Sequence, residues 1–274
     1  MDRQPVFSPD GSTVLFTSDR SGNTDIWEID LRSGRIGRVV SHPGDDMDPA
    51  YSPDGRRVIW TSNRSGHLEI YMADIDGGQP RRITDDGMDA QNATMTADQK
   101  WILYTSSHPD KRGVWKIHPD GSGAEPIVMS TNFNPEISPD GKYVLYLTSP
   151  TPLENVIRVA RVEDGVDQGI GIACDIRKAK EVVIGRARWR PDGKAIVFIA
   201  QDESGVHGVY SQPFVAGRKT DSARRKLAGF DPEWATESLG LSPDGKHLII
   251  ASWDQFWTLA LAERVPGIVR PRSR

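Results

Sequence analysis

Six polar residues recur at one position of a repeated sequence pattern: Gln4, Asp48, Asn92, Asn134, Arg186 and Ser238. Each lies four residues before a tetrapeptide related to Ser-Pro-Asp-Gly. Amide, carboxylate, guanidinium and hydroxyl groups brought to one place would bind a polar ligand through hydrogen bonds. Both signs of charge occur among them, which argues against a purely anionic or a purely cationic ligand. Glu237, one residue before Ser238, could pair with Arg186.

The tetrapeptide that follows these residues has the chemistry of a tight hairpin turn. Proline presets φ at the first central position, Asp tolerates the second, and Gly accepts the left-handed conformation that comes next. Its six copies, two of them degenerate, are spaced by 44, 44, 42, 52 and 52 residues. They begin at Ser8, Ser52, Thr96, Ser138, Arg190 and Ser242.

Short apolar runs surround each turn and indicate buried strands. The runs are β-branched and aromatic, such as Val14-Leu15-Phe16 and Val58-Ile59-Trp60, and further turns separate them. Four antiparallel strands per ~40–45 residues are typical of one propeller blade. We therefore predict an all-β fold, a single six-bladed β-propeller over residues 1–274, with blades near 1–44, 45–88, 89–131, 132–184, 185–236 and 237–270.

The six polar residues and Glu237 would then lie near the mouth of the central channel, where the innermost strands begin. Ligands of propellers usually bind there, so we expect a binding site formed by these side chains. The alternative is a water-filled channel without a specific ligand.

The last two repeats are about eight residues longer than the others, with insertions near 165–183 and 217–237. Insertions in repeat proteins map to loops on one face, often the binding face. Phe230 and Trp234 in the second insertion are candidate contacts, unless they pack under their own loop. Blade six is the least complete, because only residues 264–270 could supply its fourth strand.

The composition is that of a soluble globular chain, with 37% apolar and 26% charged residues. A net charge of −4 argues against nucleic acid as the main partner. No stretch approaches the ~20 apolar residues of a membrane helix, and the N-terminus has no signal peptide. Because Met1 directly precedes the first innermost strand, we expect a fragment of a longer protein or an early truncation.

The repeat resembles the WD40-like (PD40) repeats of the TolB propeller superfamily. The resemblance rests on an aromatic or apolar residue before Ser-Pro-Asp-Gly and on Ser-Asp/Asn-Arg-Ser-Gly after it, and it covers nearly all of the chain. Residues 66–70, 111–123, 227–233 and 262–268 look most like the C-terminal propeller of bacterial membrane-anchored serine/threonine kinases. That resemblance implies a bacterial sensor or interaction domain in the periplasm or another extracytoplasmic compartment.

Motifs for catalysis are missing from the sequence. It contains no Gly-x-Ser-x-Gly, no Gly-rich ATP loop and no His-Arg-Asp or Asp-Phe-Gly motif. Its six histidines lack metal-ligand spacing, and its single cysteine, Cys174, excludes a Cys-based zinc site. The acidic run Asp45-Asp46-Met47-Asp48 is the best metal candidate, although a solvated loop is the favoured interpretation.

We therefore expect a non-catalytic binding or sensing protein, a monomer without catalytic residues, cofactor or metal. Its partner would be a protein or peptide at one face, or a small ligand in the channel, with no nucleic acid and no membrane insertion. The alternative is a propeller enzyme, such as a metal-dependent hydrolase or lactonase, with its site in the channel.

Overall fold

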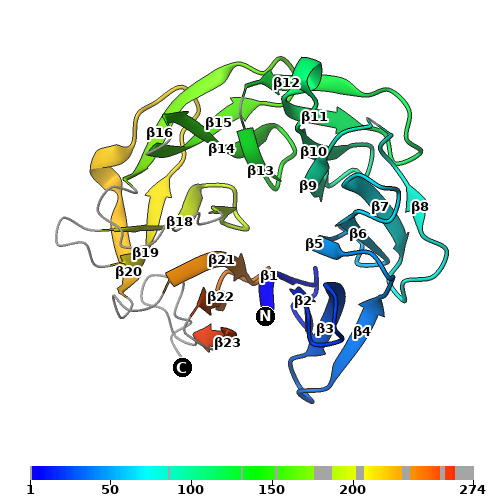
Figure 1. Cartoon of the computed structure of the whole chain (residues 1–274). Coiled ribbons are helices and arrows are strands. Elements are labelled where there is room, and N and C mark those ends of the chain that lie inside the picture. Colours follow the sequence, from blue (N-terminus) through cyan, green and yellow to red (C-terminus); the bar gives the residue numbers. More distant parts are fainter. Residues whose placement is uncertain are drawn as a thin grey trace.

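Six antiparallel sheets surround a central axis in the computed structural model, which describes residues 2–85, 87–130, 132–151, 154–175, 187–201, 207–229, 235–253 and 257–262. Each sheet is built from consecutive strands, with the first strand innermost (Figure 1). The predicted six-bladed, TolB-like propeller is confirmed. No helix in the described part of the chain is long and apolar enough to cross a membrane.

The first three blades follow the repeat closely, and each pairs four strands in sequence order. Their strands are β1 (Asp2–Phe7), β2 (Thr13–Ser18), β3 (Asp25–Asp30), β4 (Ile36–Val40), β5 (Asp46–Tyr51), β6 (Arg57–Ser62), β7 (Glu69–Asp74), β8 (Arg81–Arg82), β9 (Ala90–Met95), β10 (Ile102–Ser106), β11 (Gly113–Ile117) and β12 (Glu125–Met129). One turn of 3₁₀ helix, Pro109–Lys111, lies between β10 and β11.

The last three blades are less even. Their strands are β13 (Asn132–Ile137), β14 (Tyr143–Thr151), β15 (Glu154–Arg161), β16 (Asp167–Asp175), β17 (Arg188–Trp189), β18 (Ala195–Gln201), β19 (His207–Pro213), β20 (Arg225–Gly229), β21 (Ala235–Leu241), β22 (Leu248–Trp253) and β23 (Trp257–Ala262). A second 3₁₀ turn, Asp221–Ala223, precedes β20.

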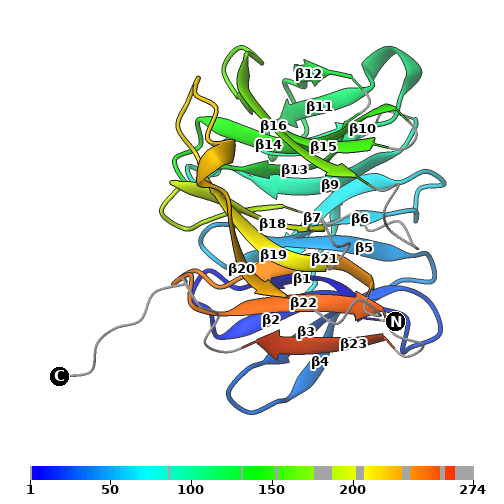
Figure 2. The same ribbon diagram turned by 90° about the vertical axis from the view of Figure 1, so that its left-hand side faces the viewer.

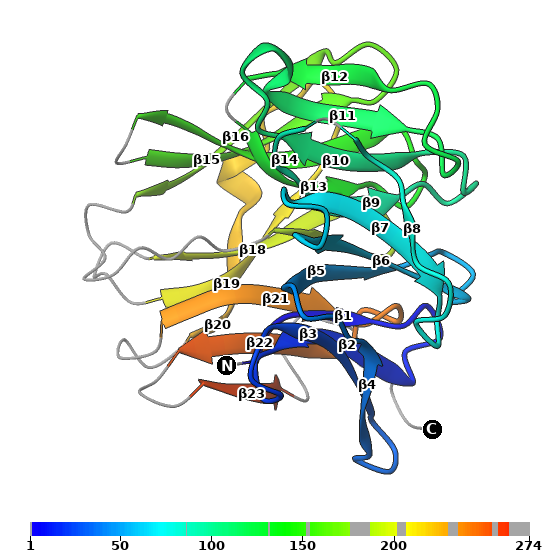
Figure 3. The same ribbon diagram turned by 45° about the vertical axis from the view of Figure 1, so that its right-hand side comes forward.

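Part of the extra length in blade four lies in its strands rather than in loops. β14, β15 and β16 contain 9, 8 and 9 residues, against 6 in β2 and β3, and this blade projects from the ring in Figure 3. Residues 176–186 and the predicted contacts Phe230 and Trp234 lie outside the described residues. Blade six has three described strands, and the fourth strand predicted at 264–270 also lies outside them.

The hydrophobic core is divided among the junctions between blades. The described residues form six clusters of buried side chains, and each cluster joins side chains of two neighbouring blades. Trp60 and Leu15 pack together between blades one and two, for example, and both are fully buried. Because each sheet is covered on both sides by its neighbours, its strands are apolar on both faces, as the sequence runs suggested.

The ring is closed by contacts between its first and last blades. β1 lies beside β21 and β22, which is visible in the side view of Figure 2. Phe7 and Val14 of blade one pack against Ile249 of blade six, and the backbone amide of Gln4 donates a hydrogen bond of 3.0 Å to Ser238 Oγ.

The Ser-Pro-Asp-Gly turns have one hydrogen-bonded form. In blade one, the buried Ser8 hydroxyl donates to Asp10 Oδ1 at 2.6 Å and accepts from the Thr13 amide at 3.0 Å, while Gly11 has a φ of +75°. The Ser8 hydroxyl and the Ser12 amide together lower the pKa of Asp10 to about 2. We call the side of the ring that bears these turns the turn face.

A candidate binding site in the central channel

The central channel contains a cavity of about 280 Å³ whose wall comes from the innermost strands of all six blades. Among the described residues, the apolar side chains that line the cavity include Phe7, Pro49, Met95, Pro135 and Trp189. Polar side chains line it as well: Ser52, Tyr51, Asn92, Thr94, Glu136 and Arg188. A cavity that combines apolar surface with placed polar groups is typical of a ligand site.

Glu136 and Arg188 are the charged residues of this wall, and they bind each other. Arg188 Nη1 donates a hydrogen bond to Glu136 Oε2, and Arg188 Nε donates to the carbonyl of Leu239 at 2.9 Å. Glu136 Oε1 also accepts from the Trp189 amide at 3.3 Å. This network joins the neighbouring innermost strands β13, β17 and β21 along the channel wall.

The pair is largely withdrawn from solvent, with 15% of the Arg188 side chain and 19% of the Glu136 side chain exposed. Arg188 Nη2 is buried and has no hydrogen-bond partner among the described residues. An unsatisfied buried donor costs about 1–3 kcal/mol, so this nitrogen is a polar group that a bound acceptor would stabilise.

Tyr51 adds a hydroxyl that is already engaged. Its phenol donates to Glu28 Oε1 at 2.8 Å and lies 2.8 Å from Thr13 Oγ1. Burial raises the pKa of Tyr51 far above its usual value, with the Glu28 carboxylate adding to the shift. The tyrosine therefore stays neutral and fixes the wall rather than exchanging protons.

Four of the polar residues predicted at the channel mouth occupy β-bulges. Gln4, Asp48, Asn92 and Asn134 have φ values of +57°, +54°, +59° and +52°, and the pairing register shifts at each of these sites. Asn and Asp tolerate this left-handed backbone better than other residues with a side chain. Backbone geometry thus favours polar residues here, independently of any ligand.

These residues also join neighbouring blades. The Gln4 carboxamide oxygen accepts from Thr17 Oγ1 at 2.7 Å and from the Asp48 amide at 3.1 Å, and its nitrogen donates to Asp48 Oδ1. The Asn92 amide likewise donates to Thr61 Oγ1 of the preceding blade at 3.2 Å. Asp48 and Ser238 are buried, so they are held within the ring wall.

Asn92 is the member of the predicted set that also lines the cavity. Arg186 lies outside the described residues, as does the side chain of Glu237, so the predicted pairing between them lies outside as well. Ligand binding by the set stays a prediction.

Sequence reasoning missed Glu136 and Arg188, which lie two residues further along the repeat. The equivalent positions in the other blades are Val6, Ala50, Thr94 and Gly240. The available signal was a pair of opposite charges at one repeat position in adjacent blades.

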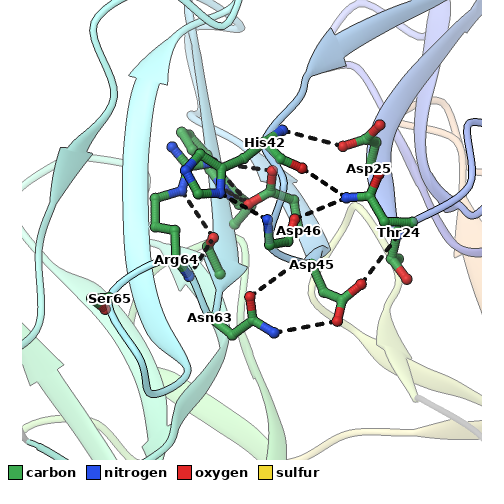
Figure 4. Close-up of polar contacts among 12 residues, drawn as sticks. Thr24, Asp25, His42, Asp45, Asp46, Asn63, Arg64 and Ser65 are labelled. Atoms are coloured by element: carbon green, nitrogen blue, oxygen red, sulfur yellow. Dashed lines mark hydrogen bonds and ion pairs between the residues drawn. The ribbon is translucent and has the colours of Figure 1, made fainter.

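The acidic run that follows blade one is used to fix loops. Asp45 Oδ1 accepts from the Thr24 amide at 3.3 Å, and its Oδ2 accepts from Asn63 Nδ2 at 3.2 Å, which links blades one and two (Figure 4). Asp46 is fully buried and accepts two hydrogen bonds from Arg64 Nη2, at 2.8 and 3.0 Å. The described part of the chain contains no group of three His, Cys, Asp or Glu side chains arranged to hold a metal ion.

The six sheets and the channel define a β-propeller, and sequence comparison places it more narrowly. The TolB beta propeller domain family (PD40) matches residues 1–168, so this chain belongs to the TolB β-propeller family. No curated protein sequence matches the chain.

Solved structures share the fold at low sequence identity. The putative TolB from Agrobacterium tumefaciens is 20% identical, with a TM-score of 0.66 over 89% of this chain and 87% of that one. TolB from Acinetobacter baumannii is also 20% identical, with a TM-score of 0.63. The match covers 80% of this chain and 55% of that protein, so this chain spans about half of that protein's length. An oligogalacturonate lyase from Vibrio parahaemolyticus is 16% identical, with a TM-score of 0.56 over 90% and 69% of the two chains.

These likenesses extend to proteins of different activities and show the fold alone. The finer resemblance to kinase propellers stays a prediction.

Proposed function

We propose that this protein is a non-catalytic binding and sensing module, and that its central channel receives a segment of a partner protein or a small ligand. The observation that carries the proposal is the state of the two charged groups in the cavity. Glu136 accepts hydrogen bonds from Arg188 and from the Trp189 amide, so its carboxylate is engaged by the protein itself.

A general acid or base needs a carboxyl group within reach of the substrate and poised to exchange its proton. A carboxylate whose oxygens already accept hydrogen bonds from a guanidinium and a backbone amide is poorly suited to that task, because a substrate would have to displace these donors. A wall that combines apolar side chains, the paired Glu136 and Arg188, and a few amide and hydroxyl groups suits recognition better than proton transfer.

Site-specific cross-linking tests this proposal. A photoreactive p-benzoylphenylalanine replaces Thr94, which is half-buried in the cavity wall, and the control carries it at the exposed Lys219. We expect the Thr94 probe to capture a partner that the Lys219 probe does not capture. The captured molecule, once purified, should bind at least about tenfold more weakly to Arg188→Gln, which loses a charged hydrogen bond.

Capture that is equal at both positions, or binding that Arg188→Gln leaves unchanged, would remove the channel as the site. Conversion of the captured molecule to a product, dependent on an added divalent ion, would instead favour the enzyme alternative.

A further inference from the structure

The turn face is sealed by a repeated contact at most of its blade junctions. A Cβ added to Gly11 would lie 3.5 Å from Pro243 Cδ, and one added to Gly55 would lie 3.5 Å from Pro9 Cδ. Each proline thus packs on the turn glycine of the next blade. The same contact joins Pro139 to Gly193 and Pro191 to Gly245.

Blade three departs from this rule because its turn reads Thr96-Ala97-Asp98-Gln99. Towards blade two, the pKa of Asp54 is lowered chiefly by the Ser52 hydroxyl and the Arg56 amide, and the Gln99 side chain adds to this shift. Towards blade four, Ala97 stands where the other turns have proline, and a Cβ added to Gly141 would have no heavy atom within 4 Å. The junction between blades three and four is therefore open.

A cavity of about 630 Å³ occupies this junction. Its volume lies within the ~300–1,000 Å³ typical of small-molecule sites. Trp101 and Val162 supply half-buried apolar surface to its wall. Trp101 is held in place by stacking on His118, with 3.9 Å between the ring centroids.

Hydrogen-bond acceptors and donors both surround this apolar surface. Asp98 and Asp140 are fixed by their own turns, where the Thr96 and Ser138 hydroxyls donate to them at 2.6 and 2.7 Å. Their outer oxygens each lie 3.9 Å from a lysine Nζ, and one of these lysines, Lys142, also lines the cavity.

Arg161 and Glu163 complete the charged part of the wall, and Arg161 pairs with Asp164 at 2.7 Å. Acceptors and donors are thus both available, and the charges largely balance. A ligand of strong net charge would gain little from such a wall.

We infer that the open junction between blades three and four is a second binding site, which takes a neutral carbohydrate of one or two sugar rings. Sugars combine an apolar C–H face, which would lie against Trp101, with hydroxyl groups that both donate to carboxylates and accept from lysine and arginine. The site is separate from the channel, so its failure and that of the proposed function are distinguishable.

Fluorine NMR of the whole chain labelled with 5-fluorotryptophan tests the inference. The Trp101 signal is assigned as the one that disappears in Trp101→Phe. Maltose, cellobiose and N,N′-diacetylchitobiose are titrated one at a time, with choline and acetate as charged controls. We expect at least one disaccharide to shift the Trp101 signal saturably, and neither charged control to do so.

Closing the junction supplies the matched variant. Ala97→Pro restores the proline side chain that seals the other junctions, and we expect it to weaken disaccharide binding at least about tenfold. Pro9→Ala removes the corresponding proline side chain between blades one and two, and it should leave binding unchanged. Lys142→Met serves as a second variant and should lose about tenfold through one charged hydrogen bond.

The inference is overturned if no disaccharide shifts the Trp101 signal, or if only choline or acetate does. It is also overturned if Ala97→Pro and Lys142→Met both bind the disaccharide as tightly as the wild type.

Discussion

Replacing Asp46 with Asn should destabilise the propeller much more than the same change at Asp2, although the two residues occupy equivalent places. Both accept from the arginine that follows the second strand: Asp46 from Arg64 at 2.8 Å and Asp2 from Arg20 at 2.6 Å. Arg64 also lies over Trp60, with its guanidinium carbon 5.4 Å from the ring centroid, and Arg20 makes comparable contacts with two aromatic rings.

The two pairs differ in burial, and burial sets the expected magnitude. Asp46 has no exposed side-chain surface and Arg64 has 12%, whereas Asp2 and Arg20 have 21% and 32%. Removing one partner of a buried pair costs about 3–5 kcal/mol. We expect roughly 3 kcal/mol for Asp46→Asn, because Arg64 keeps its bond to Ser62 Oγ, and about 0.2–1 kcal/mol for Asp2→Asn.

Urea denaturation followed by circular dichroism and tryptophan fluorescence measures the difference. With an m value of about 3 kcal/mol/M, the midpoint should fall by about 1 M for Asp46→Asn and by at most roughly 0.3 M for Asp2→Asn. Coincidence of the two probes is required before free energies are compared. The double variant Asp46→Asn/Arg64→Met should recover part of the loss, because no charge is then left buried without its partner.

Midpoints that fall equally in the two single variants would refute the reasoning, since burial would then not determine the cost. A double variant that loses as much as the sum of its single changes would show that the ion pair is not the source.

Three further outcomes follow from the turns. Ala97→Pro should stabilise the fold by about 0.4–1 kcal/mol, seen as a rise in Tm of ~1–2 °C, because it restricts the unfolded chain at a position where the other turns have proline; a fall in Tm would contradict this. Gly77→Ala should cost roughly 1–3 kcal/mol more than Gly34→Ala. Gly77 and Gly34 both have left-handed φ values, +78° and +70°, but only a Cβ added to Gly77 would meet the Val39 carbonyl oxygen, at 1.9 Å. Equal urea midpoints for the two variants would show that the backbone shifts to relieve this clash at no cost in stability. Asp10→Asn should destabilise the protein at neutral pH, and the difference from wild type should shrink as pH falls from 3.8 towards about 2, because the lowered pKa of Asp10 stabilises the fold only while the carboxyl is ionised; a difference in Tm that stays constant with pH would contradict it.

The fold could be predicted because each blade repeats its local chemistry. The turns need proline, aspartate and glycine at fixed places, and the strands need apolar residues on both faces, so both leave a signal in single stretches of sequence. The polar residues Gln4, Asp48, Asn92 and Asn134 left an equally clear signal. The left-handed bulge at each site explains part of this polar pattern. Sequence spacing alone does not distinguish a backbone requirement for these residues from a requirement to bind a ligand.

Which side chains meet in the channel and at the junctions depended on the closing of the ring. Glu136 and Arg188 are 52 residues apart and pair only because blades four and five lie side by side. The sequence shows that Ala97 replaces the proline of the other turns. The consequence, a cavity beside Trp101, is known only from the structure, because residues of blades three and four together line that cavity.

The sequence by itself determined the propeller, its turns and its uneven repeats, because these follow from interactions between residues close along the chain. The tertiary structure decided the candidate sites, because each site is lined by side chains from more than one blade. Which of these side chains meet is set by the packing of the blades against each other.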